Sequence, residues 1–198
     1  MASGQGMPLT DVDWSRLPVP EDDGAASHLA GCQLPDIPLP ATDGTEVSLA
    51  RLSRAEPSRP VVVFAYPMTG RPDAPLPAGW DEIPGARGCT PQSCAFRDHH
   101  GDLLAAGASA VFGLSTQDTA YQREAASRLH LTFPLLSDAA LRLTTALRLP
   151  VMLIEGRTLL KRMTLILEAG IIARVFYPVF PPDRNAADVL SWLRAQRG

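Results

Sequence analysis

Apolar residues occur along the chain in short runs, and two of these runs are continuous and rich in β-branched residues. They are PVVVFAY at 60–66 and SAVFGLS at 109–115. Neither run shows the alternation of apolar and polar residues that is typical of a strand with one solvent-exposed face. Continuous apolar runs of this length are typical of central strands that are covered on both faces. A third region, 159–178, holds LLKRMTLIL and IIARVFYP separated by EAG, which predicts a β-hairpin.

The segments between these strands carry helical periodicity and helix-start residues. Thr90 is a candidate N-cap, Pro91 suits the first helical position, and Gly107 is a candidate stop. Capping residues also open the segment that follows the second strand. Helices are therefore predicted over 90–106, 116–131 and 183–197, with a turn and a short helix within 133–149.

Three stretches outside this pattern complete the outline. Residues 1–30 mix Gly, Pro, Asp and Ala without periodicity, which predicts a flexible N-terminal arm. Residues 33–52 contain the turn signal TDGT between two alternating segments, which predicts an extended hairpin. The stretch 67–88 contains five prolines and four glycines, so neither a helix nor an inner strand is expected there. Loops of this length in compact domains are usually functional or mobile.

The order of these elements predicts the fold class. A β-α-β-α-β-β-α sequence implies an α/β domain with a mostly parallel sheet, helices on both faces and an antiparallel edge strand. The chain contains no internal repeat.

Composition and charge argue against several classes of protein. The chain has 198 residues, of which 45% are hydrophobic, which is sufficient for one domain with a real core. Its net charge of −3 from 18 basic and 21 acidic residues gives no sign of binding to nucleic acid or to a membrane surface. No apolar run approaches the ~20 residues of a membrane span. Three cysteines, an odd and small number, and an N-terminus without a secretion signal favour a soluble cytoplasmic protein with reduced thiols.

Two of the three cysteines lie five positions apart in GCTPQSC, at the predicted start of a helix. Unpaired N–H groups and the positive end of the helix dipole would surround the sulfur of Cys89 and favour its thiolate form. Such a thiolate attacks electrophilic oxygen or sulfur. Three interpretations compete for the pair: a redox pair, half of a metal site, or buried apolar residues of a helix.

The spacing distinguishes these interpretations in part. In a continuous α-helix, residues five apart have Cα atoms about 8.6 Å apart, whereas a disulfide requires roughly 4.4–6.8 Å. A bond between Cys89 and Cys94 would therefore require the first turn to unwind, which suits a catalytic pair better than a structural staple. Taken alone, Cys94 would most often be a small apolar residue buried in the helix. A metal site with the following His99 and His100 is less favoured, because zinc fingers use tighter spacings and Cys94 and His99 face different ways.

The segment GCTPQSCAFRD (88–98) resembles the active-site segment of the bacterioferritin-comigratory-protein, or Q-type, peroxiredoxins. The hairpin at 33–52, the strands at 60–66 and 109–115, and KRMTLIL at 161–167 are similar to further parts of that family. The resemblance implies a thioredoxin-like fold with a central mixed sheet flanked by helices and an N-terminal hairpin. It places this domain at 31–198, with an inserted Pro/Gly-rich loop at 68–86.

The resemblance also implies roles for individual residues. Cys89 would be the peroxide-attacking nucleophile, Cys94 the resolving thiol, and Arg162 the group that stabilises the thiolate and orients the peroxide. The implied activity is reduction of hydrogen peroxide or organic hydroperoxides through a sulfenic acid and a Cys89–Cys94 disulfide. It requires no metal or organic cofactor, and a thioredoxin- or glutaredoxin-like protein would be the reductant. A monomer or weak homodimer is expected.

One departure from the family pattern affects peroxide binding. The family usually has Pro-x-x-x-Thr-x-x-Cys, but Ala86 stands where the threonine is expected, and Pro67 lies 22 residues before Cys89 because about 15 residues are inserted. The threonine's role would then fall to Thr69, to Thr90 or to backbone N–H groups.

Alternative functions remain open at this point. The same fold could serve as a redox sensor or interaction protein with little peroxidase turnover. A disulfide oxidoreductase is less favoured, because the pair is not C-x-x-C. Cys32 is read as a bystander thiol, and the Pro-rich stretch 175–183 is a candidate to pack against the insertion or a second subunit.

Overall fold

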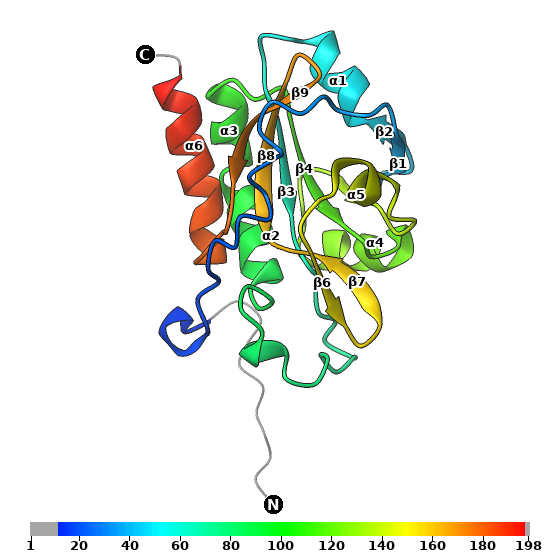
Figure 1. The fold of residues 1–198 in the computed structure, drawn as a ribbon, viewed down its shortest axis with the longest axis vertical. Coiled ribbons are helices and arrows are strands. Elements are labelled where there is room, and N and C mark those ends of the chain that lie inside the picture. The colour runs from blue at the N-terminus through cyan, green and yellow to red at the C-terminus, as the bar shows by residue number, and fades with distance from the viewer. Residues whose placement is uncertain (1–11, 197–198) are drawn as a thin grey trace, which may run out of the picture.

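A five-stranded sheet with the strand order β5-β4-β3-β8-β9 forms the centre of the molecule (Figure 1). The computed structural model describes residues 12–196. The strands are β3 (Val61–Ala65), β4 (Ala110–Ser115), β5 (Leu135–Ser137), β8 (Met163–Glu168) and β9 (Ile171–Phe176). Every residue of β3 is buried, as the continuous apolar run predicts for a central strand.

The strand directions confirm a mixed sheet and correct one detail of it. Strands β3, β4 and β5 run parallel, whereas β8 pairs antiparallel with β3, and β9 pairs antiparallel with β8. The edge strand β9 pairs antiparallel with its neighbour, as predicted, but the strand whose direction is reversed relative to β3, β4 and β5 is β8, inside the sheet. The β8–β9 hairpin joins the sheet as a unit through its first strand, and this places the reversed strand next to β3.

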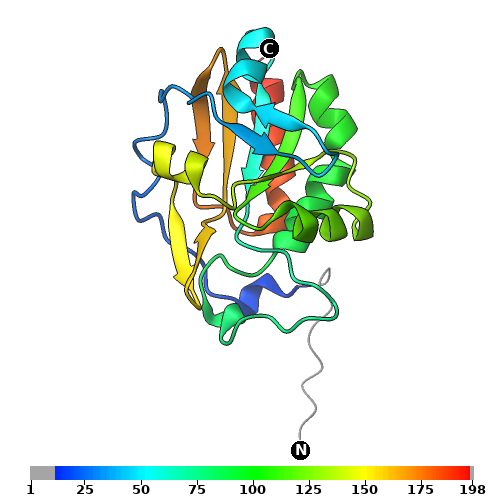
Figure 2. The same cartoon turned by 90° about the vertical axis from the view of Figure 1, so that its right-hand side faces the viewer.

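Helices cover both faces of the sheet, as predicted for an α/β domain. Phe96 of α2 stacks on Phe64 of β3 with ring centroids 4.2 Å apart, which fixes α2 against the sheet centre. One face carries α2 (Cys89–Asp98), α3 (His100–Ala105) and α6 (Asn185–Ala195). The other face, toward the viewer in Figure 2, carries α1 (Leu49–Ala55), α5 (Arg142–Leu147) and the β1–β2 hairpin (Pro38–Pro40 and Glu46–Ser48). Helix α4 (Thr119–Arg128) lies beside β5.

Several predicted boundaries change in the structure. The N-terminal hairpin is present, but 49–52 belongs to α1, because the Ser48 side chain caps this helix by accepting a hydrogen bond from Arg51 N. The helix predicted over 90–106 is two helices separated at His99, whose ψ of 2° is not helical. The helix predicted over 116–131 is shorter at both ends, with Asp118 as its N-cap. The last helix was predicted to Arg197, which lies outside the described residues.

Two strands between α5 and β8 were absent from the sequence prediction. β6 (Val151–Ile154) and β7 (Arg157–Leu160) form a separate antiparallel hairpin whose turn is Glu155–Gly156. Both turn residues have positive φ, 48° and 75°, as two-residue hairpin turns of the I′ type require. The prediction ran 159–167 together as one strand, but Lys161 and Arg162 interrupt it. The short strand β5 was likewise predicted only as part of a turn.

The described part of the predicted arm packs on the domain. Trp14 Nε1 donates a hydrogen bond of 2.8 Å to Asp183, and Asp23 accepts hydrogen bonds from Lys161 and Tyr177. Leu29 is completely buried in the core on the α1 side of the sheet. Residues 12–30 are therefore held by specific contacts, whereas 1–11 lie outside the described residues.

The Pro/Gly-rich insertion forms its own small apolar cluster with the β6–β7 hairpin. Trp80, in the 3-10 turn η2 (Trp80–Glu82), is only 4% exposed. It belongs to a cluster that includes Met68 and Ala86 from the insertion and Ile154 and Leu159 from the hairpin. Both views place the insertion, the first turn of the arm and the β6–β7 hairpin at the same end of the molecule (Figures 1 and 2). The insertion is thus docked by apolar burial.

Replacing Trp80 with alanine is expected to lower the free energy of unfolding by about 3 kcal/mol, because a large buried ring leaves a cavity. Urea unfolding followed by circular dichroism measures this change. The matched control is Leu153→Ala on the same hairpin, where the side chain is 74% exposed and the loss should stay within about 0.5 kcal/mol. Equal small losses in the two variants would contradict the docking of the insertion.

Candidate active site

Cys89 occupies the first position of α2, at the end of the insertion. Gly88 is the N-cap and has a φ of 107°, a conformation that favours glycine. A Cβ at Gly88 would lie 2.6 Å from Pro182 Cγ and 2.8 Å from Trp14 Cη2, so these two side chains cover the helix start closely. Cys89 itself is 4% exposed. The helix begins one residue earlier than the sequence predicted, and this places Cys89 within the first turn.

Arg162 lies beside the Cys89 sulfur, as the resemblance implied. It immediately precedes β8, is 3% exposed, and its Nη2 donates a hydrogen bond of 3.2 Å to Cys89 Sγ. A guanidinium at this distance attracts negative charge on the sulfur and can donate a hydrogen bond to it. The first-turn N–H groups of Cys89 and Thr90 have no acceptor within the helix and act in the same direction.

The last residues of the insertion hold the Arg162 guanidinium in place. Nη2 also donates to three consecutive carbonyl oxygens, those of Gly85, Ala86 and Arg87, at 3.1 to 3.2 Å. Cys89 Sγ in turn contacts the carbonyl of Ala86 at 3.7 Å. Ala86, which stands where the family pattern has a threonine, therefore contacts both Arg162 and Cys89 through its carbonyl oxygen.

Among the described residues, Nε of Arg162 is a buried donor without a hydrogen-bond partner. The guanidinium is planar and its five N–H donors have fixed directions. Nη1 and Nη2 both have protein partners, whereas Nε has none. Burying a donor without a partner costs free energy, so a ligand oxygen at this position would be stabilised.

A buried chain of polar side chains fixes the other end of the guanidinium. Nη1 of Arg162 donates to Gln92 Oε1 at 2.5 Å, and Gln92 Nε2 donates to Asn185 Oδ1 at 2.9 Å. The same Asn185 oxygen accepts a hydrogen bond from Thr164 Oγ1 at 2.7 Å. Gln92, Asn185 and Thr164 are each no more than 2% exposed. The chain connects α2, α6 and β8 and thereby holds Arg162 in register with Cys89.

Cys94 lies on the same helix as Cys89 and is a free thiol, as is Cys89. It is half-buried, and burial raises the pKa of the Cys94 thiol above its ordinary value, with Arg97 as an opposing cation. Cys94 is therefore held mainly as the neutral thiol while the helix is intact. Cys32, the third cysteine, is also free and donates to His28 O, away from α2.

The two threonines proposed to replace the family's hydroxyl occupy different places. Thr90 is buried in the first turn of α2, next to Cys89. Thr69 is also buried, but its hydroxyl donates to Gln117 Oε1 at 3.2 Å and its backbone N–H donates to the same oxygen at 3.0 Å. Their roles toward peroxide stay predictions, and the hydrogen bonding of Thr69 to Gln117 makes Thr90 the better placed of the two.

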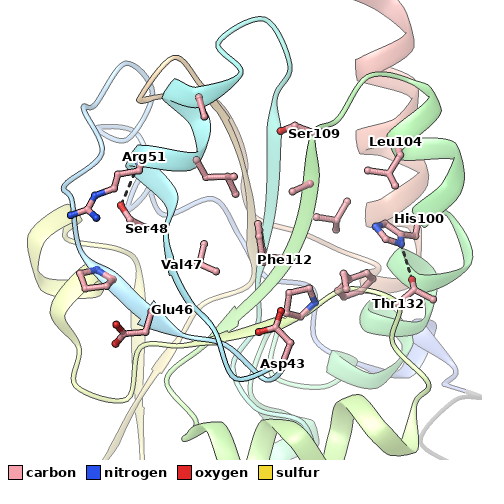
Figure 3. A pocket seen from close by; sticks show the side chains of 17 residues that line it. Asp43, Glu46, Val47, Ser48, Arg51, His100, Leu104, Ser109, Phe112 and Thr132 are labelled. Atoms are coloured by element: carbon pink, nitrogen blue, oxygen red, sulfur yellow. Dashed lines mark hydrogen bonds between the residues drawn. The ribbon is translucent and has the colours of Figure 1, made fainter.

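A larger groove of about 810 Å³ lies away from these residues, between the β2–α1 segment and α3 (Figure 3). Figure 3 shows Val47 and Arg51 on one wall, His100 and Leu104 on the other, and Phe112 between them. None of the predicted site residues lines it. The position of the reactive groups, and not the size of this groove, therefore locates the candidate active site.

Residues 12–196 offer neither a cluster of metal ligands nor a membrane-spanning helix. No group of three or more His, Cys, Asp or Glu side chains in this range could hold a metal ion. None of the helices in this range is both long enough and apolar enough to cross a membrane.

Comparisons with known proteins agree with this geometry. The Redoxin family model matches residues 29–190. The chain is 32% identical to the chloroplastic peroxiredoxin Q of Oryza sativa subsp. japonica over 166 residues, which are 83% of this chain and 66% of the rice protein. It is 31% identical to the chloroplastic peroxiredoxin Q of Sedum lineare over 166 residues, 83% of this chain and 77% of that protein. The crystal structure of the peroxidoxin BcpB from Mycobacterium tuberculosis superposes with a TM-score of 0.68 at 28% identity, covering 86% of this chain and 100% of that one.

Proposed function

Because the chain belongs to the redoxin family, within its peroxiredoxin Q group, we propose that it reduces hydrogen peroxide or organic hydroperoxides with its own thiols. The observation that carries the proposal is the contact of 3.2 Å between Arg162 Nη2 and Cys89 Sγ at a covered helix start. This contact places a fixed cation next to the sulfur that would attack the peroxide.

In the first step, the Cys89 thiolate attacks the terminal oxygen of the peroxide. The S–O bond forms as the O–O bond breaks, and the leaving hydroxide or alkoxide takes a proton to become water or alcohol. Nε of Arg162, the unpartnered donor, is the group that would hold an oxygen of the O–O bond during attack. Developing negative charge on the leaving oxygen is stabilised by the same cation.

In the second step, the sulfenic acid on Cys89 condenses with the Cys94 thiol, which releases water and forms a disulfide. The first turn of α2 has to unwind for the sulfurs to meet, because residues five apart in a helix are too distant for a disulfide. Trp14 and Pro182, which cover Gly88 closely, have to move as well. Unwinding also exposes Cys94 to water and thus relieves the burial that raises its pKa.

A dithiol protein would complete the cycle by thiol–disulfide exchange through a mixed disulfide. We propose a thioredoxin- or glutaredoxin-like reductant, and a monomer or weak homodimer as the working form. A reducing compartment such as the cytoplasm, which the small number of cysteines favours, would supply this reductant.

Stopped-flow mixing of the reduced protein with hydrogen peroxide tests the proposal. The expected result is consumption of one equivalent of peroxide at a rate at least about 100-fold above that of free cysteine, as expected for a positioned and charge-stabilised nucleophile. Mass spectrometry of the product should then show the loss of two hydrogens and a peptide containing Cys89 joined to Cys94. A rate no better than that of free cysteine would contradict the proposed function.

A further inference from the structure

The N-terminal arm, residues 12–24 of the described chain, runs over the start of the helix that carries both reactive cysteines. Its first turn, η1 (Trp14–Arg16), is drawn in dark blue beside the insertion (Figures 1 and 2). This turn presents the Trp14 indole to Gly88, the residue before Cys89. A Cβ built on Gly88 would lie 2.8 Å from Trp14 Cη2, so no free space separates the indole from this part of the backbone.

The arm is held at two points, and both sets of contacts are made at the surface. At one point, Trp14 Nε1 donates a hydrogen bond of 2.8 Å to Asp183 Oδ2. At the other, Asp23 accepts a hydrogen bond of 2.7 Å from the Tyr177 hydroxyl. Both partners belong to the Pro-rich stretch 175–183, which therefore packs against the arm. Contacts between exposed groups are individually weak because water competes for both partners, so the arm is held in a way that permits release.

The arm opposes the movement that would join Cys89 to Cys94. The first backbone hydrogen bond of α2 runs from Gln92 N to Gly88 O over 3.0 Å, and it breaks when the first turn unwinds. Gly88 then has to leave the place where the Trp14 indole lies against it. The indole contact thus exists only in the wound form of α2 and shifts the equilibrium toward that form.

We infer that residues 12–24 form a latch on the start of α2, and that Trp14 is the positioning residue through which the latch controls disulfide formation. The inference rests on the proposed function. While the latch is closed, Cys89 stays beside Arg162 and reacts with peroxide. When the latch opens, the first turn unwinds and Cys94 reaches the sulfenic acid on Cys89.

The latch therefore decides between two fates of the sulfenic acid. In the first, a bond forms between the sulfurs of Cys94 and Cys89, the S–O bond breaks, and the hydroxyl group leaves with the thiol proton as water. In the second, another molecule of hydrogen peroxide oxidises the sulfenic acid to a sulfinic acid and is itself reduced to water. A tighter latch prolongs the life of the sulfenic acid and favours the second product. The arm thus sets how much peroxide the protein withstands before Cys89 is inactivated.

Quenched-flow kinetics of Trp14→Ala, followed by mass spectrometry, test the latch. Alanine removes both the indole that lies against Gly88 and the donor to Asp183. Disulfide formation should become about tenfold faster, whereas sulfenic acid formation should stay within about twofold, because the reacting groups are not touched. With an excess of hydrogen peroxide, the fraction of sulfinic acid should fall. A general loosening of the site would instead slow the first step, since Arg162 and Cys89 would lose their alignment.

Hydrogen exchange of the Gln92 amide measures the latch without peroxide. Exchange requires the hydrogen bond from Gln92 N to Gly88 O to open, so its rate reports how often the first turn unwinds. In Trp14→Ala this exchange should also be about tenfold faster. The matched control is Arg16→Ala, an exposed side chain of the same turn, which should change neither the exchange nor the two rates of oxidation.

Asp183→Ala provides a second variant, at an exposed residue, that keeps the indole in the chain. It should speed disulfide formation about threefold, because it removes the acceptor of Trp14 Nε1. Added to Trp14→Ala it should have no further effect, because both changes remove the same hydrogen bond. If Trp14→Ala does not fold, Asp183→Ala decides the question by the same two measurements.

Unchanged disulfide formation and Gln92 exchange in Trp14→Ala would overturn the inference, as would an equal gain in Arg16→Ala. Failure of the proposed function is a separate result. The unmodified protein would then react with hydrogen peroxide no faster than free cysteine, whereas the exchange of the Gln92 amide would still respond to the latch.

Discussion

Replacing Cys89 with serine is expected to abolish peroxide consumption, with the rate falling by about 10³-fold or more, because no other group in the site can act as the nucleophile. A serine hydroxyl at the same place is not ionised at neutral pH and does not form a stable oxidised product with peroxide. The measurement is stopped-flow peroxide consumption by the purified variant.

Cys94→Ser gives the complementary result and separates the two steps. This variant is expected to consume one equivalent of peroxide at a rate close to that of the unmodified protein and then to stop. The product should gain one oxygen by mass, as a sulfenic acid on Cys89, and no disulfide should form. Turnover with a dithiol reductant should be lost, because the bond that the reductant exchanges is absent.

The matched control is Cys32→Ser. Cys32 is a free thiol that donates to His28 O, outside the helix that carries the other two. Its replacement should leave both the first equivalent and the turnover unchanged. If Cys32→Ser stopped turnover while Cys94→Ser did not, the two-cysteine scheme would have assigned the wrong resolving thiol.

The central strands, and the position of Arg162 beside Cys89, were the parts of the structure that the sequence predicted best. The runs at 60–66 and 109–115 are apolar on both faces, and they became the adjacent strands β3 and β4. The five-residue spacing of Cys89 and Cys94 favoured a catalytic redox pair over a structural disulfide. Arg162 was identified through family resemblance, since an arginine that meets a sulfur 73 positions away in the chain leaves no local pattern.

What the sequence could not predict depends on contacts without a local signal. The carbonyls of Gly85, Ala86 and Arg87 hold Arg162, and every residue has a carbonyl. Gln92 meets Asn185 across 93 positions, at a helix end that shows no polar motif. The β6–β7 hairpin is different, because its two-residue turn Glu155–Gly156, with a glycine at the second position, was visible in the sequence between VMLI and RTLL.

The packing of the insertion against the rest of the domain could not be predicted for the same reason. Prolines and glycines indicated a functional or mobile loop but not the element against which it packs. The structure places Trp80 in an apolar cluster with the β6–β7 hairpin, an element that the sequence prediction had missed. The position of the insertion could therefore not be predicted until the hairpin that receives it was known.

Replacing Arg162 with methionine is expected to lower the second-order rate constant for oxidation of Cys89 by about 10² to 10³-fold, the usual loss when a preorganised transition-state donor is removed. Methionine keeps the apolar length of the side chain but removes the cation, the contact with Sγ and the unpartnered Nε donor. Arg162→Lys should recover little of this loss. A lysine ammonium has three donors at one point and cannot reach Gln92, the carbonyls and the sulfur together.

The rate of alkylation by iodoacetamide separates positioning of the peroxide from general reactivity of the sulfur. Both reactions need the thiolate, but only peroxide reduction needs a donor on the breaking O–O bond. Arg162→Met should therefore slow peroxide reduction more than alkylation, whereas Arg174→Met, an exposed arginine of β9, should slow neither. Equal losses in the two reactions would mean that Arg162 acts only on the ionisation of Cys89. Since Nε would then have no role at the O–O bond, the unpartnered donor of Arg162 would no longer support a peroxide oxygen at that position.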